Sequence, residues 1–317
     1  MTNQAKQDNR FHIGIDVAKA KLDIHCLETG ADWQVENNTK EIRAFARRHH
    51  KMLAQSYIAI ETTGGYEHLC CEALHGRGYK VHQAHSYRVK SFIRSMGQGA
   101  KTDRLDAMML AAYGHERKTK LRLYAPRSAN QQLLKSLMLR REDLVKMQTQ
   151  EKNRLAGPMA KALEASFKAI LKAIANQIKL VERKIRACIK QDENLQAREK
   201  VLLQIKGIGE ITSCSLLALL PELGAMDRKQ AAALAGLAPY AKDSGEYRGY
   251  RSVKGGRPAV RRALFMAALS AVRHNREMKI FYTRLRANGK KPIVALTATA
   301  RKLVTIANAR IRDMKLS

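Results

Sequence analysis

The hydrophobic pattern of the chain changes at Pro126, and this change limits what the chain can fold into. Before Pro126, short apolar runs with strand character are interleaved with helical segments. Three consecutive strands, followed by alternating helices and strands, predict a mixed sheet covered by helices. We therefore expect an α/β domain over residues 1–125. Its predicted strands are 11–17, 21–27, 33–35, 56–61 and 79–84, and its predicted helices are 39–53, 66–76, 88–95 and 103–117.

After Pro126 the pattern is helical. Residues 126–196 contain one break, at Gly157-Pro158. Beyond this break, apolar residues recur at alternating spacings of four and three over about three heptads, which predicts a coiled-coil-like helix pair. A helical hairpin within one chain and an oligomerisation stalk both satisfy this pattern. The residues of this seam are Phe167, Leu171, Ile174, Ile178, Val181, Ile185 and Cys188.

The last segment, residues 197–317, is predicted to be an all-α module. Its helices are expected near 210–220, 227–236, 258–275, 277–287 and 292–313. A loop rich in glycine, arginine and tyrosine, residues 241–256, interrupts them.

The charge balance indicates a polyanionic partner. The chain has 59 Lys and Arg residues against 28 Asp and Glu residues, a formal net charge of +31. Residues 201–317 hold 22 of the basic and only 7 of the acidic residues. Self-repulsion of this size is tolerated when a phosphate backbone lies against the surface. The last third is therefore the expected nucleic-acid surface.

Cysteine usage and hydropathy indicate the compartment. No apolar run approaches the roughly 18–20 residues that span a bilayer, and the first residues lack a signal-peptide core. The five cysteines are scattered and include no C-x-x-C. We therefore expect a reducing, cytoplasmic location and no membrane partner.

Four carboxylates could form one metal site. Asp16 lies on the first predicted strand, Glu61 ends another, and Asp103 and Asp106 share one face of a predicted helix. Each one alone is typical of a turn, a cap or a partner of the helix dipole. As a set, they offer the oxygen ligands that suit Mg²⁺ or Mn²⁺ and phosphoryl transfer.

A glycine-rich turn and several cations are candidate nucleic-acid contacts. Lys206, Gly207 and Gly209 have the form of a helix–hairpin–helix turn, in which backbone N–H groups approach a phosphate. A plain tight turn between packed helices gives the same pattern. Further phosphate contacts are predicted at Arg248, Arg251, Lys254, Arg257, Arg261, Arg262, Lys290 and Lys291.

The loop also contains a candidate nucleophile. Ser244 lies beside a glycine in a basic loop and could attack a phosphodiester there. Tyr240, Tyr247 and Tyr250 are rival nucleophiles in the same segment.

Taken together, these motifs resemble the DEDD transposases of bacterial insertion sequences, the "IS one-ten" family of bridge-RNA-guided recombinases that includes pilin-gene invertases. The resemblance extends over nearly the whole chain. Its carriers are residues 13–19 (IGIDVAK), 60–66 (IETTGGY), 101–107 (KTDRLDA), 207–212 (GIGEIT), 234–239 (LAGLAP), 243–245 (DSG), 261–266 (RRALFM) and 288–291 (NGKK).

The resemblance implies a RuvC-like (ribonuclease-H-type) domain over 1–125, a coiled-coil region over 126–196 and a transposase domain over 197–317. It implies that Asp16, Glu61, Asp103 and Asp106 bind Mg²⁺ and that Ser244 forms a covalent phosphoserine–DNA intermediate. The implied partners are donor and target DNA, a structured non-coding guide RNA and further copies of the chain, in a dimer or tetramer. The serine loop continues Gly245-Glu246-Tyr247, and residue 65 is glycine, where members of the family tend to differ.

Three functions remain distinguishable at this point. The first is a transposase or site-specific recombinase, which includes an invertase that works without a guide RNA. The second is a RuvC-like endonuclease or junction resolvase that hydrolyses DNA with metal-activated water. The third is a basic nucleic-acid-binding scaffold without activity.

Overall fold

The computed structural model describes residues 10–62, 64–97, 103–119, 121, 123–158, 160–241, 243–244, 247–249 and 251–314. The chain forms two compact units, Met1–Pro126 and Arg127–Ser317. Within the described residues, no helix combines the length and apolar character that crossing a membrane requires.

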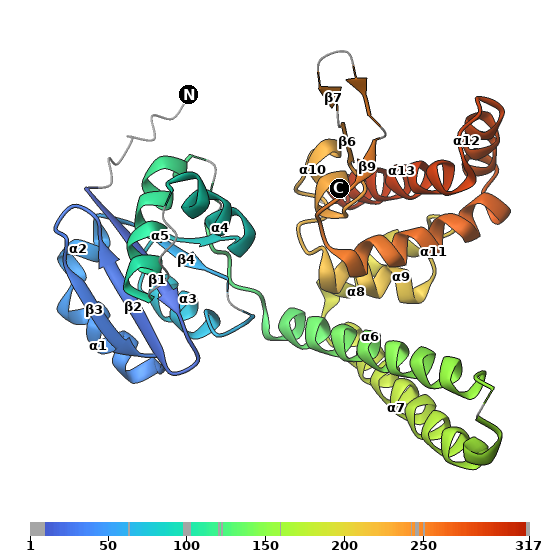
Figure 1. The fold of residues 1–317 in the computed structure, drawn as a ribbon, viewed down its shortest axis with the longest axis horizontal. Coiled ribbons are helices and arrows are strands. Elements are labelled where there is room, and N and C mark those ends of the chain that lie inside the picture. The colour runs from blue at the N-terminus through green and yellow to red at the C-terminus, as the bar shows by residue number, and fades with distance from the viewer. Residues whose placement is uncertain are drawn as a thin grey trace. The chain divides into compact units, whose positions relative to one another are not determined.

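The first unit contains a five-stranded mixed sheet with the strand order β3-β2-β1-β4-β5 (Figure 1). The strands β1, β2 and β3 form an antiparallel meander, whereas β4 and β5 extend the sheet in parallel with β1. The predicted mixed sheet is therefore confirmed. The strands are β1 (Phe11–Val17), β2 (Lys21–Cys26), β3 (Asp32–Glu36), β4 (Ser56–Glu61) and β5 (Val81–Ala84).

Helices cover both faces of this sheet. Ile13, Ile15 and Val17 of β1 lie in a core with residues of α1 and α3. Ala59 of β4 lies in a separate core with residues of α4 and α5. Since neighbouring residues of a strand point to opposite faces, the even-numbered residues of β1 face α5. The helices of this unit are α1 (Thr39–Arg48), α2 (His50–Ala54), α3 (His68–His75), α4 (Ser86–Ser95) and α5 (Asp103–Arg117).

The second unit begins with a helical hairpin formed by α6 (Ala129–Leu155) and α7 (Glu164–Lys190), which pack against each other along their lengths (Figure 1). A short 3₁₀ helix, η1 (Ala160–Leu163), precedes α7. Every residue of the predicted seam is buried or half-buried. The seam residues of α7 pack within the chain, against α6 and the helices that follow. Of the two predicted arrangements, a helical hairpin and an oligomerisation stalk, the structure contains the hairpin.

The remaining helices continue the hydrophobic core of the hairpin. Leu134 of α6 and Ile185 of α7 belong to the same core as Leu264 of α11 and Val304 of α13. These helices are α8 (Glu193–Leu203), α9 (Glu210–Leu219), α10 (Arg228–Leu234), α11 (Pro258–His274), α12 (Arg276–Ala287) and α13 (Pro292–Asp313). The helix α8 has no counterpart among the predicted segments, whereas the other helices follow those segments closely.

The loop over 241–256 departs from the all-α expectation. Two-residue strands β6 (Pro239–Tyr240) and β9 (Ser252–Val253) pair at its base, and β7 (Asp243–Ser244) pairs with β8 (Tyr247–Arg248) beyond them. Such short strands depend on pairing across the loop, because they bury too little apolar surface to form alone. The described residues of this loop therefore form a narrow antiparallel ribbon on a helical unit.

Candidate functional site

The register of the central strands brings two of the predicted acids to one edge of the sheet. The strands β1 and β4 are parallel, and Ile15 pairs with Ile60. Asp16 and Glu61 are the next residues of these two strands, and both are half-buried. Because neighbouring strands lie about 4.8 Å apart, the backbones of Asp16 and Glu61 are adjacent at the carboxyl ends of β1 and β4.

Both acids lie on the face that α5 covers. A Cβ atom on Gly14 would lie 2.1 Å from the Ala107 carbonyl oxygen and 2.4 Å from the Ala111 amide nitrogen, so α5 contacts β1 directly at this glycine. A Cβ atom on Gly114 would lie 3.0 Å from the Cβ of Ala59. Asp16 and Glu61 each come two residues after a strand residue that faces α5, and they therefore point to the same face.

The direction of α5 brings the other two acids to the same edge. Ala107 lies against Gly14, whereas His115 lies 3.3 Å from His12, measured between their Nδ1 atoms. The helix therefore runs antiparallel to β1, and its first turn lies where β1 ends. Asp103 and Asp106 belong to this first turn. Asp106 is half-buried, and the side chain of Asp103 lies outside the described residues.

A fifth acid, which the sequence did not single out, lies beside this group. Asp23 of β2 pairs with Asp16 in the antiparallel register. Its Oδ1 atom accepts a hydrogen bond from Gln34 at 2.8 Å, and its Oδ2 atom lies 3.2 Å from Lys21 Nζ. Asp23 therefore already has a cationic partner. Only the strand register, which is absent from the sequence pattern, could have indicated this position.

Ser244 belongs to the second unit. It lies in β7 and pairs with Tyr247 of β8, so the backbone of the serine is part of the ribbon. The side chains of Ser244, Tyr247 and Arg248 lie outside the described residues, as does Tyr250 entirely. The role of Ser244 stays a prediction.

Two arginines that were predicted to contact nucleic acid hold the base of this ribbon. Both terminal nitrogens of Arg257 donate to the carboxylate of Glu222 at 2.6 Å, and one also donates to the Leu219 carbonyl at 2.8 Å. Arg261 donates to the carbonyls of Gly236 and Gly255 at 3.1 and 3.2 Å. These contacts give both side chains a structural role, and contact with a phosphate remains a prediction for them.

We expect the ion pair with Arg257 to make stability depend on pH. Burial raises the pKa of Glu222, but the hydrogen bonds and charge of Arg257 outweigh it, so the pKa lies below its ordinary value. A lowered pKa stabilises the fold above the unfolded-state pKa, and this stabilisation is lost as the pH falls through the folded-state pKa. Glu222→Gln should therefore cost about 1–3 kcal/mol at pH 7. Urea unfolding followed by circular dichroism should show this deficit shrinking below about pH 4.5. A deficit that is independent of pH would contradict the role of the ion pair.

The two glycines of the predicted helix–hairpin–helix turn lie in different surroundings. Gly207 has a φ of +111°, and a Cβ atom there would lie 2.4 Å from the Cβ of Ala271, so this glycine is required for packing. Gly209 precedes α9 and faces open space. Lys206 is exposed, and its carbonyl accepts a hydrogen bond from Asn275 at 3.0 Å. Of the two glycines, Gly209 at the N-cap of α9 therefore has open space beside it, whereas Gly207 is packed against α11.

The other predicted cations lie on the surface. Arg251, Lys254, Lys290 and Lys291 are exposed. Arg262 is also exposed, and it donates to Glu142 of α6 at 2.7 Å.

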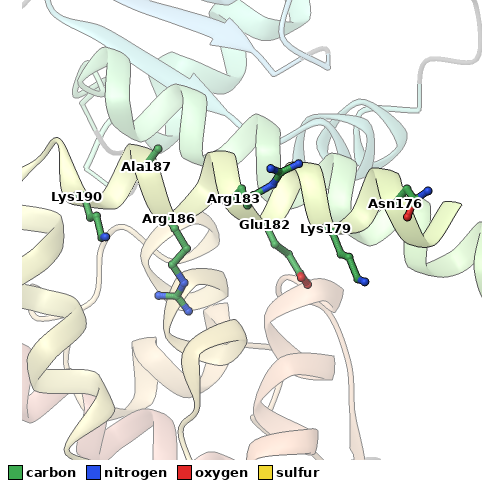
Figure 2. Close-up of a pocket in the computed structure, with 7 residues that line it drawn as sticks. All are labelled: Asn176, Lys179, Glu182, Arg183, Arg186, Ala187 and Lys190. Carbon is green, nitrogen blue, oxygen red and sulfur yellow. The ribbon is translucent and has the colours of Figure 1, made fainter. Parts of the chain in front are cut away.

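A basic groove on α7 was missed. The hollow has a volume of about 740 Å³. In Figure 2, the side chains of Lys179, Glu182 and Arg186, which line it, point to the same side of the helix. The positive charge is partly balanced, because Arg186 pairs with Glu199 at 2.7 Å. These cations recur at helical spacing in the sequence, which is the signal that could have indicated the groove. The prediction for this helix rested on its apolar seam alone. The lining residues are Asn176, Lys179, Glu182, Arg183, Arg186, Ala187 and Lys190.

A second hollow, of about 670 Å³, lies beside the base of the ribbon. It combines cations with aromatic rings, and the ammonium of Lys302 lies 4.8 Å from the ring centre of Phe281. Tyr240, one of the rival nucleophiles, is exposed at its edge. Cations beside aromatic faces are typical of surfaces that bind single-stranded nucleic acid. The polar and aromatic lining residues are Arg228, Lys229, Tyr240, Phe281, Arg301, Lys302 and Thr305.

Comparison with known proteins identifies the family. Residues 13–163 match a family model described as transposase, and residues 199–283 match the model of the IS116/IS110/IS902 transposase family. The chain is 30% identical to the pilin gene-inverting proteins of Moraxella lacunata and Moraxella bovis, over 96% of this chain and 97% of each relative. It is 29% identical to an IS110 insertion element protein of Streptomyces coelicolor, over 47% of this chain and 36% of that protein. The matches thus include both compact units, and the chain belongs to the IS116/IS110/IS902 family of transposases, which makes it an enzyme of DNA recombination.

Proposed function

We propose that the protein is a site-specific DNA recombinase in which four carboxylates and one serine cut and rejoin DNA. Asp16, Glu61, Asp103 and Asp106 would bind Mg²⁺, or Mn²⁺ in its place. The observation that carries this proposal is the parallel register of β1 and β4 combined with the antiparallel direction of α5. This arrangement supports a single oxygen-rich site at the carboxyl edge of the sheet.

The donor set and its surroundings fit a divalent cation. Four carboxylates at one edge would repel one another without a cation, and hard oxygen ligands are those that Mg²⁺ and Mn²⁺ prefer. Gly14 allows the backbone of α5 to approach β1, which a larger residue would prevent. When bound, such an ion neutralises the charge that develops on the phosphate.

Ser244 would act as the nucleophile. Its Oγ atom forms a bond to phosphorus while the bond from phosphorus to the leaving strand oxygen breaks. The serine proton passes to a base, and the leaving oxygen gains one. A strand hydroxyl later attacks the same phosphorus and releases the serine, so that no ATP is required. The serine could come from the same copy or a neighbouring copy of the chain.

The partners follow from this function. DNA is the substrate of a transposase, and the excess of 22 basic over 7 acidic residues in 201–317 favours phosphate binding by this segment. We include in the proposal a structured guide RNA, encoded by the element, and assembly into dimers or tetramers. Sequencing the nucleic acid that co-purifies with the protein, and mapping it to the neighbouring locus, would identify both the RNA and the DNA target.

DNA inversion is a second candidate for the biological event. The relatives named pilin gene-inverting proteins match nearly the full length of the chain, whereas the insertion element proteins match about half of it. Inversion and transposition share the same cutting and joining chemistry. They differ in the arrangement of the DNA sites, which recombination assays with directly or inversely repeated sites would distinguish.

We expect Ser244→Ala to abolish covalent protein–DNA adducts while DNA binding stays within about threefold of wild type. The substitution removes the only oxygen of the side chain that could bond to phosphorus. Adducts formed on the mapped target DNA would be measured on denaturing gels, with binding measured by filter retention.

The matched controls are Tyr240→Phe, Tyr247→Phe and Tyr250→Phe, which remove the rival hydroxyl groups and should leave the adduct in place. An undiminished adduct in Ser244→Ala would remove the serine from its role. Free DNA ends without any adduct in the wild type would indicate a hydrolytic nuclease.

A further inference from the structure

Two histidines and one glutamate meet at the opposite edge of the same sheet. His12 lies near the start of β1, Glu28 follows β2, and His115 lies in the last turn of α5. His12 Nδ1 lies 2.6 Å from Glu28 Oε1 and 3.3 Å from His115 Nδ1, and one ligand atom from each residue lies within 4.8 Å of the others. We propose that these three residues bind a transition metal ion of the Zn²⁺ type.

This site is distinct from the acid group. His12 comes four residues before Asp16 on the same strand, which corresponds to about 13 Å along β1. Two imidazoles and one carboxylate also form a different donor set from four carboxylates. Imidazole nitrogen suits Zn²⁺, Co²⁺ and Ni²⁺, whereas Mg²⁺ and Mn²⁺ prefer oxygen.

The distances are close to those of a ligand set. Two nitrogens that each lie about 2.0–2.1 Å from a tetrahedral ion are about 3.3 Å apart, which equals the separation of the Nδ1 atoms of His12 and His115. The Glu28 oxygen lies at hydrogen-bond distance from His12, so it must move outward by less than about 1 Å. The Glu28 side chain is only partly covered and has room for this shift.

His12 Nδ1 is shared between two neighbouring polar atoms in the structure. His12 Nδ1 carries at most one proton, yet it faces both the Glu28 carboxylate and the Nδ1 atom of His115. One proton on His12 Nδ1 cannot form a good hydrogen bond to Glu28 and to His115 at the same time. A cation between the three acceptors interacts with all of them at once.

The surroundings hold the ligands in place and leave access for an ion. The His12 ring is buried, and it packs edge-on against His115 with ring centres 4.4 Å apart. The second oxygen of Glu28 accepts the backbone N–H of His12 at 2.7 Å, which orients the carboxylate in the way that supporting contacts orient metal ligands. Glu28 and His115 are exposed, so an ion and its water ligands can enter from solvent.

The ion would join three elements of the unit. It would link the start of β1, the turn after β2 and the carboxyl end of α5. The amino end of α5 carries Asp103 and Asp106, and therefore a clamp at His115 fixes the same helix on which two of the four acids lie. The inference concerns stability and metal binding, and it does not depend on the proposed recombinase chemistry.

Titration of the full-length protein with Co²⁺ and Zn²⁺, in excess Mg²⁺, tests this inference. We expect one equivalent of Co²⁺ to give a visible absorption band that one equivalent of Zn²⁺ removes. Zn²⁺ should also raise the melting temperature reported by Trp33, the single tryptophan of the chain, which lies on β3 of this unit. Both His115→Ala and Glu28→Gln should weaken Zn²⁺ binding by at least about 100-fold, and they alter exposed side chains.

The matched control is His274→Ala, an exposed histidine in the last turn of α11, which should bind Zn²⁺ as the wild type does. Asp16→Asn should also retain Zn²⁺ binding, so failure of the acid site and failure of this site can be told apart. Unchanged Zn²⁺ affinity in His115→Ala, or no stoichiometric Co²⁺ band in the wild type, would overturn the inference.

Discussion

Asp16→Asn is expected to lower Mg²⁺-dependent DNA cleavage by at least about 1,000-fold. The substitution keeps the size of the side chain but removes one anionic ligand from the proposed metal site. A thousandfold loss corresponds to about 4 kcal/mol of transition-state stabilisation, which is the range expected for a lost metal ligand. Single-turnover cleavage of the mapped target DNA, at saturating Mg²⁺, measures this effect.

Asp23→Asn is the matched control for this prediction. Asp23 lies opposite Asp16 in the strand register and undergoes the same chemical change. Its carboxylate is already held by Gln34 and Lys21, and we expect less than about a threefold loss of cleavage. An equal loss in both variants would show that total negative charge, and not a specific ligand, determines activity.

Gly14→Val is expected to destabilise the first unit by at least about 3 kcal/mol and to abolish metal-dependent cleavage. The first side-chain carbon alone would lie 2.1 Å from the Ala107 carbonyl oxygen, so α5 must move away from β1. This movement would displace the first turn of the helix, to which Asp106 belongs. Urea unfolding followed by Trp33 fluorescence reports on this unit, because Trp33 packs against Phe45 of α1.

The control for this prediction is Gly76→Ala at the end of α3. Gly76 has an ordinary φ of −62°, and an added Cβ would touch only the carbonyl of Glu72 in the same helix, at 3.1 Å. We expect a change of less than about 1 kcal/mol there. A Gly14→Val protein as stable as this control would contradict the close contact between α5 and β1.

Much of the fold could be predicted because its signals are local. Strand alternation, apolar helix faces and the break at Pro126 each lie within a short window of sequence. The strands β6 and β9 could not be predicted, since they form through the pairing of Pro239 with Val253 and of Tyr240 with Ser252, which are distant in the sequence. The sequence pattern likewise predicted the seam of α7 and a helix pair, but it left open whether the partner helix belongs to the same chain.

The candidate site was partly predictable for the same reason. Asp16 and Glu61 stood out because Asp16 lies near the end of one predicted apolar strand and Glu61 ends another, and the register of the two strands then explains their proximity. Arg257 was interpreted as a phosphate contact because its partner, Glu222, is 35 residues away. The ligands His12 and His115 are separated by 103 residues, and no spacing rule connects them.

Mn²⁺ binding, measured by electron paramagnetic resonance on the full-length protein, tests the central claim most directly. The central claim is that four separate acids form one cation site. His274→Ala, which alters an exposed histidine of α11, should retain the Mn²⁺ affinity of the wild type and serves as the control. Each of Asp16→Asn, Glu61→Gln, Asp103→Asn and Asp106→Asn should weaken the same single site by at least about tenfold. Wild-type Mn²⁺ affinity in any two of these four variants would contradict the claim.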